Sequence, residues 1–78
     1  MSVFFLSDII NEVAREFDVG PDELRSRSRH RRCAWPRQEI YRRLRLRGWT
    51  LTQIGRALGR NHATILHGIN QAERRLCA

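Results

Sequence analysis

The residues best suited to chemistry lie just after Gly59, where a short run of small and polar side chains begins. Asn61 opens this run, and His62, Ala63 and Thr64 follow it directly. An Asn at this place is a natural N-cap for a helix, and small or polar side chains in a first helical turn can approach the edges of base pairs. The free N–H groups at a helix start also favour a phosphate. The run therefore predicts contact with nucleic acid.

The same sequence argues against catalysis and against a metal centre. Its imidazoles and thiols are few: His30, His62, His67, Cys33 and Cys77. No His–Cys pairing is enforced, the two cysteines follow no metal spacing, and two histidines five positions apart do not share one helical face. We therefore expect no enzymatic activity, no cofactor, no metal and no small-molecule substrate.

Charge is distributed very unevenly along the chain. All 15 basic residues are Arg, against 8 acidic residues, for a net charge of +7. The first 24 residues carry one Arg and six acids, whereas the remainder carries 14 Arg and two acids. Arg offers a planar fork of donors that suits phosphates and guanine edges. A directed field of this kind favours a polyanionic partner on one side of the molecule.

Apolar periodicity predicts that these side chains are carried by helices alone. The chain starts with a helical hairpin over 7–24, with Ser7 as N-cap, an end at Gly20 and a short second helix that starts at Pro21. An exposed basic arm over 25–33 follows, because that stretch is rich in Arg and has no apolar period. A helix over 35–47 comes next, with a core stripe of Ile40, Tyr41 and Leu44, and Gly48 stops it.

The last third of the chain predicts a helix-turn-helix over 50–75. Thr50 and Gln53 form a T-x-x-Q capping box in front of a bracing helix at about 51–58. A turn at Gly59 leads to a recognition helix at about 62–75, whose inner stripe is Ile65, Ile69, Ala72 and Leu76. In this motif the second helix presents its first residues to the major groove. The predicted fold class is therefore all-α, a small helical bundle that forms one domain over 1–78.

Two stretches of this sequence resemble the C-terminal DNA-binding domain of the bacterial replication initiator DnaA. They are the W-P-R-Q step at 35–38 and the block L-T-Q-I-G-R-A-L-G-R-N-H-A-T-I-L-H at 51–67. The resemblance runs from about Ile9 to Leu76 and implies the same helix-turn-helix fold. It also implies a role for each matching position. Base reading falls to Asn61, His62, Ala63 and Thr64, minor-groove contact to Arg29, and backbone contact to Arg37, Gln38, Leu51, Thr52 and His67. We also expect backbone contact from Arg31 of the basic arm and from Arg60 at the turn.

Departures from the family pattern bear on specificity and on role. The family has Asp where this chain has Asn61, and Thr where it has Ala63. An Asn can donate as well as accept and can pair bidentately with adenine, so we expect altered preference at the base that it faces. The 78 residues hold no G-x-x-x-x-G-K-[ST] phosphate loop. The expected role is therefore a transcriptional regulator, phage-related or part of a longer protein, and the alternative is a replication-linked protein that binds or competes for initiator boxes.

Other partners are weighed against duplex DNA. An RNA-stacking surface needs exposed aromatic rings, and we expect at least two of Trp35, Tyr41 and Trp49 to lie in the core. No apolar run approaches the roughly 20 residues of a membrane span, and the start has no secretory signal. We therefore expect a cytoplasmic, nucleoid-associated protein with no membrane partner. The alternative of another class is a module that docks a protein, the transcription machinery or a second regulator, through its acidic N-terminal helix.

Overall fold

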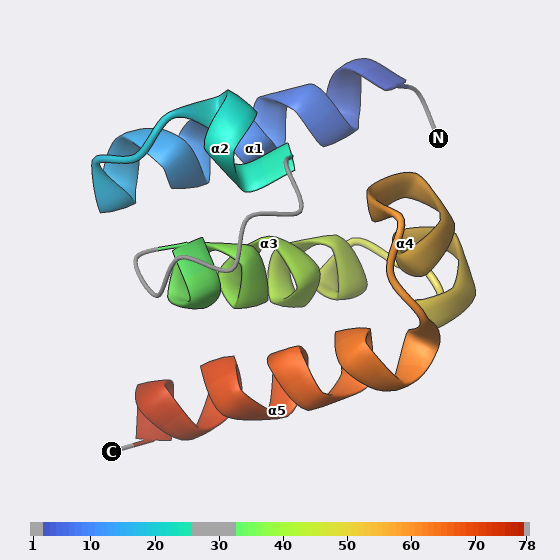
Figure 1. The fold of residues 1–78 in the computed structure, drawn as a ribbon. Helices are drawn as coiled ribbons and strands as arrows, with labels where there is room; N and C mark the ends of the chain where they lie inside the picture. The colour runs from blue at the N-terminus through green and yellow to red at the C-terminus, as the bar shows by residue number, and fades with distance from the viewer. Residues whose placement is uncertain (1–2, 26–32, 78) are drawn as a thin grey trace.

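The fold is a stack of helices in which one helix is covered on both sides. In the computed structural model, which describes residues 3–25 and 33–77, the helices are α1 (Val3–Phe17), α2 (Pro21–Arg25), α3 (Ala34–Leu46), α4 (Leu51–Leu58) and α5 (His62–Cys77). α3 lies between α1 and α5 and packs on both, while α4 closes one end of the stack (Figure 1). The described ranges contain no strand. The predicted all-α bundle with a helix-turn-helix is confirmed.

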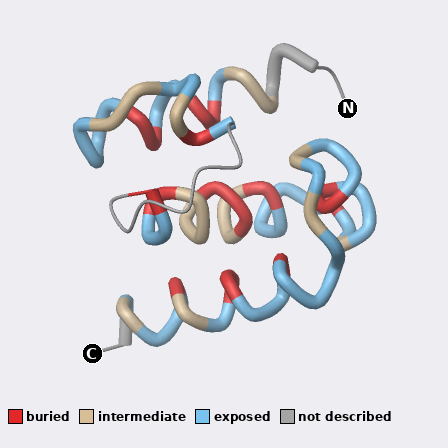
Figure 2. Tube along the Cα trace, viewed as in Figure 1, coloured by how far each residue is buried: buried red, intermediate tan, exposed pale blue. Residues whose placement is uncertain are grey.

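The core forms where the apolar stripes of these helices meet. Ile40, Tyr41 and Leu44 of α3 are all buried, as predicted, and Leu44 is completely so. They meet one stripe from α1 and another from α5, and Figure 2 shows the buried positions of α5 on the side that faces α3. The stripe of α1 consists of Ile9, Ile10, Val13 and Ala14, and that of α5 includes Ile65 and Ile69. Burial of these side chains is the main force that holds α5 against α3.

The first helix differs from its predicted bounds at both ends. α1 begins at Val3, so Ser7 is not its N-cap. The hydroxyl of Ser7 instead accepts a hydrogen bond from Nη2 of Arg25, at 3.1 Å. The helix ends at Phe17 rather than Gly20, because Asp18 already takes the left-handed conformation with φ of 54°. Asp tolerates this conformation better than most residues, so a glycine is not needed at the turn.

The predicted basic arm is too long at both of its ends. Arg25 is the last residue of α2, and Cys33 is completely buried beside the start of α3. Both residues belong to the packed helices, and 26–32 lie outside the described residues. α3 itself starts and stops one residue before its predicted limits. Gly48 follows it with φ of 94°, a backbone conformation that suits glycine.

The end of α5 shows where helical periodicity misleads. Leu76, predicted in the inner stripe, is 65% exposed, and the stripe ends at Ala72. The guanidinium of Arg75 lies 4.4 Å from the centre of the Trp35 ring and donates to Oε1 of Gln38. This Arg therefore covers α3 at the level where Leu76 was expected. Trp35 stays exposed, while the other two aromatic rings in question, Tyr41 and Trp49, are buried as expected.

Candidate nucleic-acid interface

Hydrogen bonds fix both ends of α4, the helix that leads into the corner with α5. At the start of α4, the N–H of Gln53 donates to the Thr50 hydroxyl at 3.1 Å, and Oε1 of Gln53 accepts from the Thr50 N–H at 2.8 Å. The predicted capping box is therefore present. At the other end, Gly59 is left-handed, with φ of 68°, and the N–H of Arg60 donates to the carbonyl of Gly55. The capping box therefore fixes where α4 begins, and the left-handed Gly59 with the bond from Arg60 ends α4 and turns the chain towards α5.

Close approach at this corner depends on Gly55. A Cβ atom at this position would lie 2.5 Å from the carbonyl oxygen of Arg60, a distance that real Cβ atoms do not tolerate. Gly68 has a similar role where α5 meets α3, since a Cβ there would lie 2.7 Å from the ring of Tyr41. Gly55 therefore lets the turn lie close against α4, and Gly68 lets α5 lie close to α3. The I-G step in the sequence is the signal for the first of these contacts.

Asn61 caps the second helix, as predicted from its position. Its side-chain oxygen accepts the N–H of Thr64 at 2.9 Å, and its backbone carbonyl accepts the N–H of Ile65 at 3.2 Å. Ile65 is completely buried and anchors the first turn in the core. The residues from Asn61 to Thr64 are all exposed. The first turn of α5 is thus fixed from inside and open to solvent outside.

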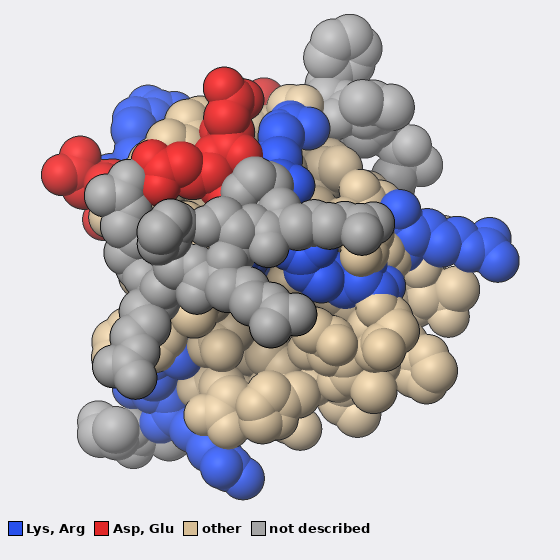
Figure 3. All heavy atoms as spheres, in the orientation of Figure 1, with Lys and Arg blue, Asp and Glu red and all other residues tan. Residues whose placement is uncertain are grey.

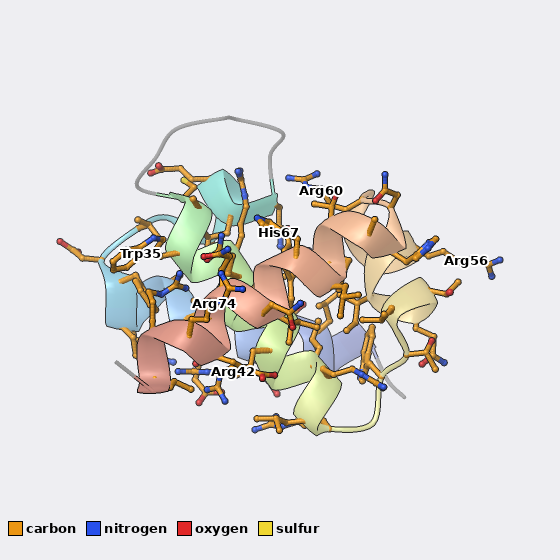
Figure 4. All side chains as sticks on the ribbon, turned by 90° about the horizontal axis from the view of Figure 1, so that it is seen from below. Trp35, Arg42, Arg56, Arg60, His67 and Arg74 are labelled. Carbon is orange, nitrogen blue, oxygen red and sulfur yellow. The ribbon has the colours of Figure 1, made fainter. Side chains whose placement is uncertain are left out.

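A solvent-open hollow of about 300 Å³ lies at this corner. Two helices and the turn contribute to its lining, which consists of Thr52, Gly55, Arg56, Gly59, Arg60, Asn61 and His62. Four of the predicted contact residues, Thr52, Arg60, Asn61 and His62, are therefore brought together. Figure 4 shows Arg56 and Arg60 at the corner, with His67 further along α5. His67 is exposed. Leu51 is partly buried against the core, so the part of Leu51 that is available to a ligand is its backbone at the start of α4.

Arg56 is the residue of this hollow that sequence reasoning missed. It is exposed on α4 and is one of the residues that line the hollow. Its place outside the apolar stripe of Leu51, Ile54 and Leu58 indicated an exposed side chain, but no pattern in the sequence assigned it to the hollow. Its charge adds to that of Arg60 at a place where the helix start already favours an anion.

Arg37 and Gln38 have internal partners as well as the backbone role that the family resemblance implies. The guanidinium of Arg37 donates to the carbonyls of Glu23, at 2.8 Å, and Leu24, at 3.2 Å, at the end of α2. Oε1 of Gln38 accepts from Arg75 at 2.6 Å. These bonds make both side chains contribute to holding α2 and α5 against α3. Arg29 and Arg31 lie outside the described residues, so their contacts stay predictions.

Acidic residues concentrate away from the corner. On the face shown in Figure 3, they gather at the upper left, over α1 and α2, whereas Arg side chains also spread to the right and to the lower left. Glu16 of α1 receives two hydrogen bonds from Arg43 of α3, at 2.6 and 2.9 Å, and Arg43 also bonds Glu39 at 2.8 Å. The hydrogen bond from Arg43 lowers the pKa of Glu16 below its ordinary value. The hydrogen bond from Arg42, more than the one from Arg43, lowers the pKa of Glu39.

Two other kinds of site are absent from the described residues. Within them, no three His, Cys, Asp or Glu side chains gather in a way that could hold a metal ion. None of the helices over 3–25 and 33–77 is long and apolar enough to cross a membrane.

A bracing helix, a tight turn and a second helix with an open polar first turn define a helix-turn-helix DNA-binding domain. Residues 6–72 match the family model described as the bacterial dnaA protein helix-turn-helix, and the chain belongs to that family. It is 40% identical over 68 residues to the chromosomal replication initiator protein DnaA of Lachnoclostridium phytofermentans, and 33% identical over 72 residues to that of Deinococcus deserti.

The match covers most of this chain and a small fraction of each relative. It includes 85% of the chain for the first relative and 91% for the second, but only 15% and 16% of the relatives themselves. The initiator of Desulfatibacillum aliphaticivorans gives the same result, with 39% identity over 91% of the chain and 16% of the relative. No solved structure matches the chain.

Proposed function

We propose that this chain binds double-stranded DNA in a sequence-specific manner, with the first turn of α5 in the major groove. The hollow at the α4–α5 corner is the observation that carries the proposal. It combines two arginines, Arg56 and Arg60, with the exposed N-cap residue of α5, Asn61. Arginines and a helix start together favour a phosphate, and the adjoining polar turn can then reach base edges.

Two groups of residues divide the work in this proposal. The base-reading group is the exposed turn Asn61, His62, Ala63 and Thr64. The backbone group surrounds it and consists of Leu51, Thr52, Arg60 and His67, with Arg56 added from the structure. Arg31, Arg37 and Gln38 extend the backbone contact, and Arg29 reaches the adjacent minor groove. Backbone contacts set the register on the duplex, whereas base contacts carry the sequence preference.

The role that follows from such binding is transcriptional regulation by occupancy of a site. The family match favours a site related to the initiator box, because the match includes the exposed turn of α5. The same occupancy at an origin would compete with the initiator, which is the replication-linked alternative. Chromatin immunoprecipitation with sequencing separates these roles, since bound sites lie at promoters in the first case and at an origin in the second.

The binding itself is tested by selection from random duplexes, followed by fluorescence anisotropy at several salt concentrations. We expect one enriched motif, and an affinity that falls steeply as salt rises because bound phosphates release counterions. His62→Ala should reduce affinity for the enriched motif by about tenfold and leave non-specific affinity nearly unchanged. If the chain showed no affinity for duplex DNA even at low salt, the proposal would be wrong.

Charge asymmetry favours a second candidate, the docking of a protein through the acidic surface of α1. Some of the negative charge of α1 is already paired with an arginine of the same chain. Glu16 is bound by Arg43 of the same chain, and Oε1 of Glu12 lies 3.9 Å from the same guanidinium. The internal pairing makes duplex DNA the better-supported partner. Docking becomes the preferred function only if the salt series detects no duplex binding.

A further inference from the structure

One arginine joins the last turn of α5 to the start of α3. The guanidinium of Arg75 lies 4.4 Å from the centre of the Trp35 ring. Its Nη1 atom donates to Oε1 of Gln38 at 2.6 Å, and its Nη2 atom lies 3.5 Å from the carbonyl oxygen of Trp35. Figure 1 shows the end of α5 beside the start of α3, where these contacts lie. Arg75 therefore meets a ring, a backbone carbonyl and a side-chain amide of α3 together.

The ring of Trp35 restricts where this guanidinium can point. Trp35 is 58% exposed, so its position over α3 is not explained by burial in the core. A cation is attracted to the face of an indole ring, and the planar fork of Arg can lie flat on it while its N–H groups reach acceptors at the edge. With the ring below it, the fork of Arg75 is directed at Oε1 of Gln38.

The side chain of Gln38 is held from two sides. Its Cγ atom lies 3.2 Å from the point that a Cβ would occupy at Gly68 of α5, so the stem packs closely on that helix. At the other end, the guanidinium of Arg75 can only donate, so the Gln38 atom that faces it must be the oxygen. The NH₂ group is therefore at the opposite edge of the amide. It supplies donors, which a phosphate oxygen requires.

From this arrangement we infer that Arg75, supported by Trp35, is a positioning residue that fixes the amide of Gln38 so that its NH₂ group donates to a DNA phosphate. The inference rests on the proposed function, in which Gln38 contacts the duplex backbone. Without Arg75 the amide is free to turn over, and its oxygen would then face the phosphate as a second acceptor. An unheld glutamine must also be ordered on binding, which costs affinity.

A direct phosphate contact by Arg75 is the competing account, because its charge lies beside the same amide. The two accounts differ in salt dependence. Gln38 is neutral, so its contact with a phosphate releases no counterion, whereas a contact by an arginine does. Both accounts concern the backbone, so in either case the effect should be the same for every duplex sequence.

The test is a double-variant cycle in duplex affinity, measured by anisotropy well below the melting temperature of each protein. Gln38→Ala should weaken binding by about tenfold, the usual loss for a hydrogen bond to a charged group, and Arg75→Ala by about fivefold. The matched control is Arg74→Ala, which removes the same charge from the preceding, exposed residue. In the Gln38→Ala background, loss of Arg75 should cost no more than this control. Two losses that simply multiply, or full affinity in Gln38→Ala, would overturn the inference.

Salt dependence and a conservative variant separate positioning from charge. The slope of log affinity against log salt should be the same in Arg75→Ala and Arg74→Ala. A slope shallower by about 0.9 in Arg75→Ala alone would assign the phosphate to Arg75 itself and overturn the inference. Arg75→Lys keeps the charge but lacks the planar fork, so it should also lose affinity. Full affinity in Arg75→Lys would equally contradict positioning.

Gln38→Glu distinguishes the phosphate contact from a purely structural role. It keeps the shape of the side chain and an oxygen for Arg75, but an oxygen replaces the NH₂ group. Thermal stability should be unchanged or slightly higher, since Arg75 gains an ion pair at a partly exposed site. Affinity should nevertheless fall further than in Gln38→Ala, and full affinity would contradict the inference. If the natural protein binds no duplex even at low salt, the proposed function fails. If it binds and the cycle shows no coupling, only this inference fails.

Discussion

Single residues at the α4–α5 corner either hold the backbone or face solvent, and a few do both. Asn61 is of the mixed kind, with an oxygen that caps α5 and an NH₂ group at the surface. Arg60 donates to the carbonyl of Leu58 at 3.3 Å and also lines the hollow. Mixed residues are hard to interpret from mutation alone, because binding and stability change together. Residues with an exposed side chain alone, such as Arg56 and Thr52, give clearer tests.

Arg56→Ala tests the phosphate contact that the structure adds to the predicted site. We expect affinity for all duplexes to fall by about tenfold, because a charged hydrogen bond to the backbone is lost whatever the sequence. The slope of log affinity against log salt should become shallower by about 0.9, the value for one phosphate. The matched control is Arg15→Ala, which removes the same charge from the exposed side of α1. Equal loss in the two variants would show that only net charge matters and that Arg56 makes no contact.

Much of the site was predictable at this scale, for reasons that differ between residues. Asn61 and Thr50 are caps, and caps are local features that a few neighbouring residues determine. The internal bonds of Arg37 and Gln38 were not predictable, because their partners lie on α2 and α5, far away in the sequence. Arg56 was missed because a single Arg on a short helix has no pattern of its own.

At the scale of elements, the relation of α4 to α5 depends on the absence of a side chain at Gly55. Gly55→Ala places a Cβ against the carbonyl oxygen of Arg60, and backbone cannot move aside as cheaply as a side chain. We expect the free energy of unfolding to fall by about 1–3 kcal/mol, the usual cost of overpacking. Denaturant unfolding measures this change.

The control for this substitution is Gly20→Ala, the same chemical change at a roomier site. There the nearest atom to an added Cβ is a side-chain oxygen of Glu23 at 3.4 Å, and the backbone is not left-handed. Stability should be unchanged or slightly higher, since Ala restricts the unfolded chain. Equal destabilisation of the two variants would mean that the loss of stability in Gly55→Ala does not come from the close approach of Gly55 to the carbonyl oxygen of Arg60.

The start of α4 gives a second prediction, in which two threonines separate stability from binding. Thr50→Ala removes the capping box and should lower the free energy of unfolding by about 1 kcal/mol. Thr52→Ala leaves the cap intact and should lower affinity for duplex DNA with little change in stability. Thermal unfolding by circular dichroism and anisotropy on the same samples measure both quantities. The assignment of Thr52 to the interface is wrong if its removal leaves DNA affinity unchanged.

Element boundaries show how far sequence patterns reach. The bracing helix, its cap and its glycine stop were predicted because those signals are local. The start of α1 was not, since Ser7 has the right chemistry for a cap but finds Arg25 of α2 instead. Leu76 continues the period of α5, yet Arg75 stacked on Trp35 occupies that level of α3. Helical periodicity shows which residues of α5 share a face, but burial also depends on which of those residues contacts the side chains of α3.

At the scale of the whole molecule, an ion network among the described residues joins the acidic α1 to the basic α3. Arg43 of α3 links Glu16 of α1 to Glu39 of α3, and Arg42 bonds the same Glu39 at 2.7 and 2.8 Å. The guanidinium groups of Arg42 and Arg43 keep the pKa values of Glu39 and Glu16 below their ordinary range. The network therefore ties the acidic α1 to the rest of the bundle while both glutamates are charged.

This coupling predicts loss of stability in acid. A carboxyl group whose pKa is lower in the folded state binds protons more readily when unfolded, so its contribution is present above the unfolded pKa and is lost as pH falls through the folded pKa. The free energy of unfolding should therefore decline as the pH is lowered from neutral past about 4.5, the ordinary value for these groups. Glu39→Gln keeps the size of the side chain and removes its titration. The variant should be less stable than the natural protein at neutral pH, and its stability should depend less on pH.

Asp8→Asn is the matched control, because it removes an exposed carboxylate of α1 that joins no ion pair among the described residues. Its unfolding curve should follow that of the natural protein at every pH. Urea unfolding at several pH values between about 7 and about 3 supplies the comparison. Should Glu39→Gln and the natural protein lose stability in parallel, the acid sensitivity would belong to other carboxylates.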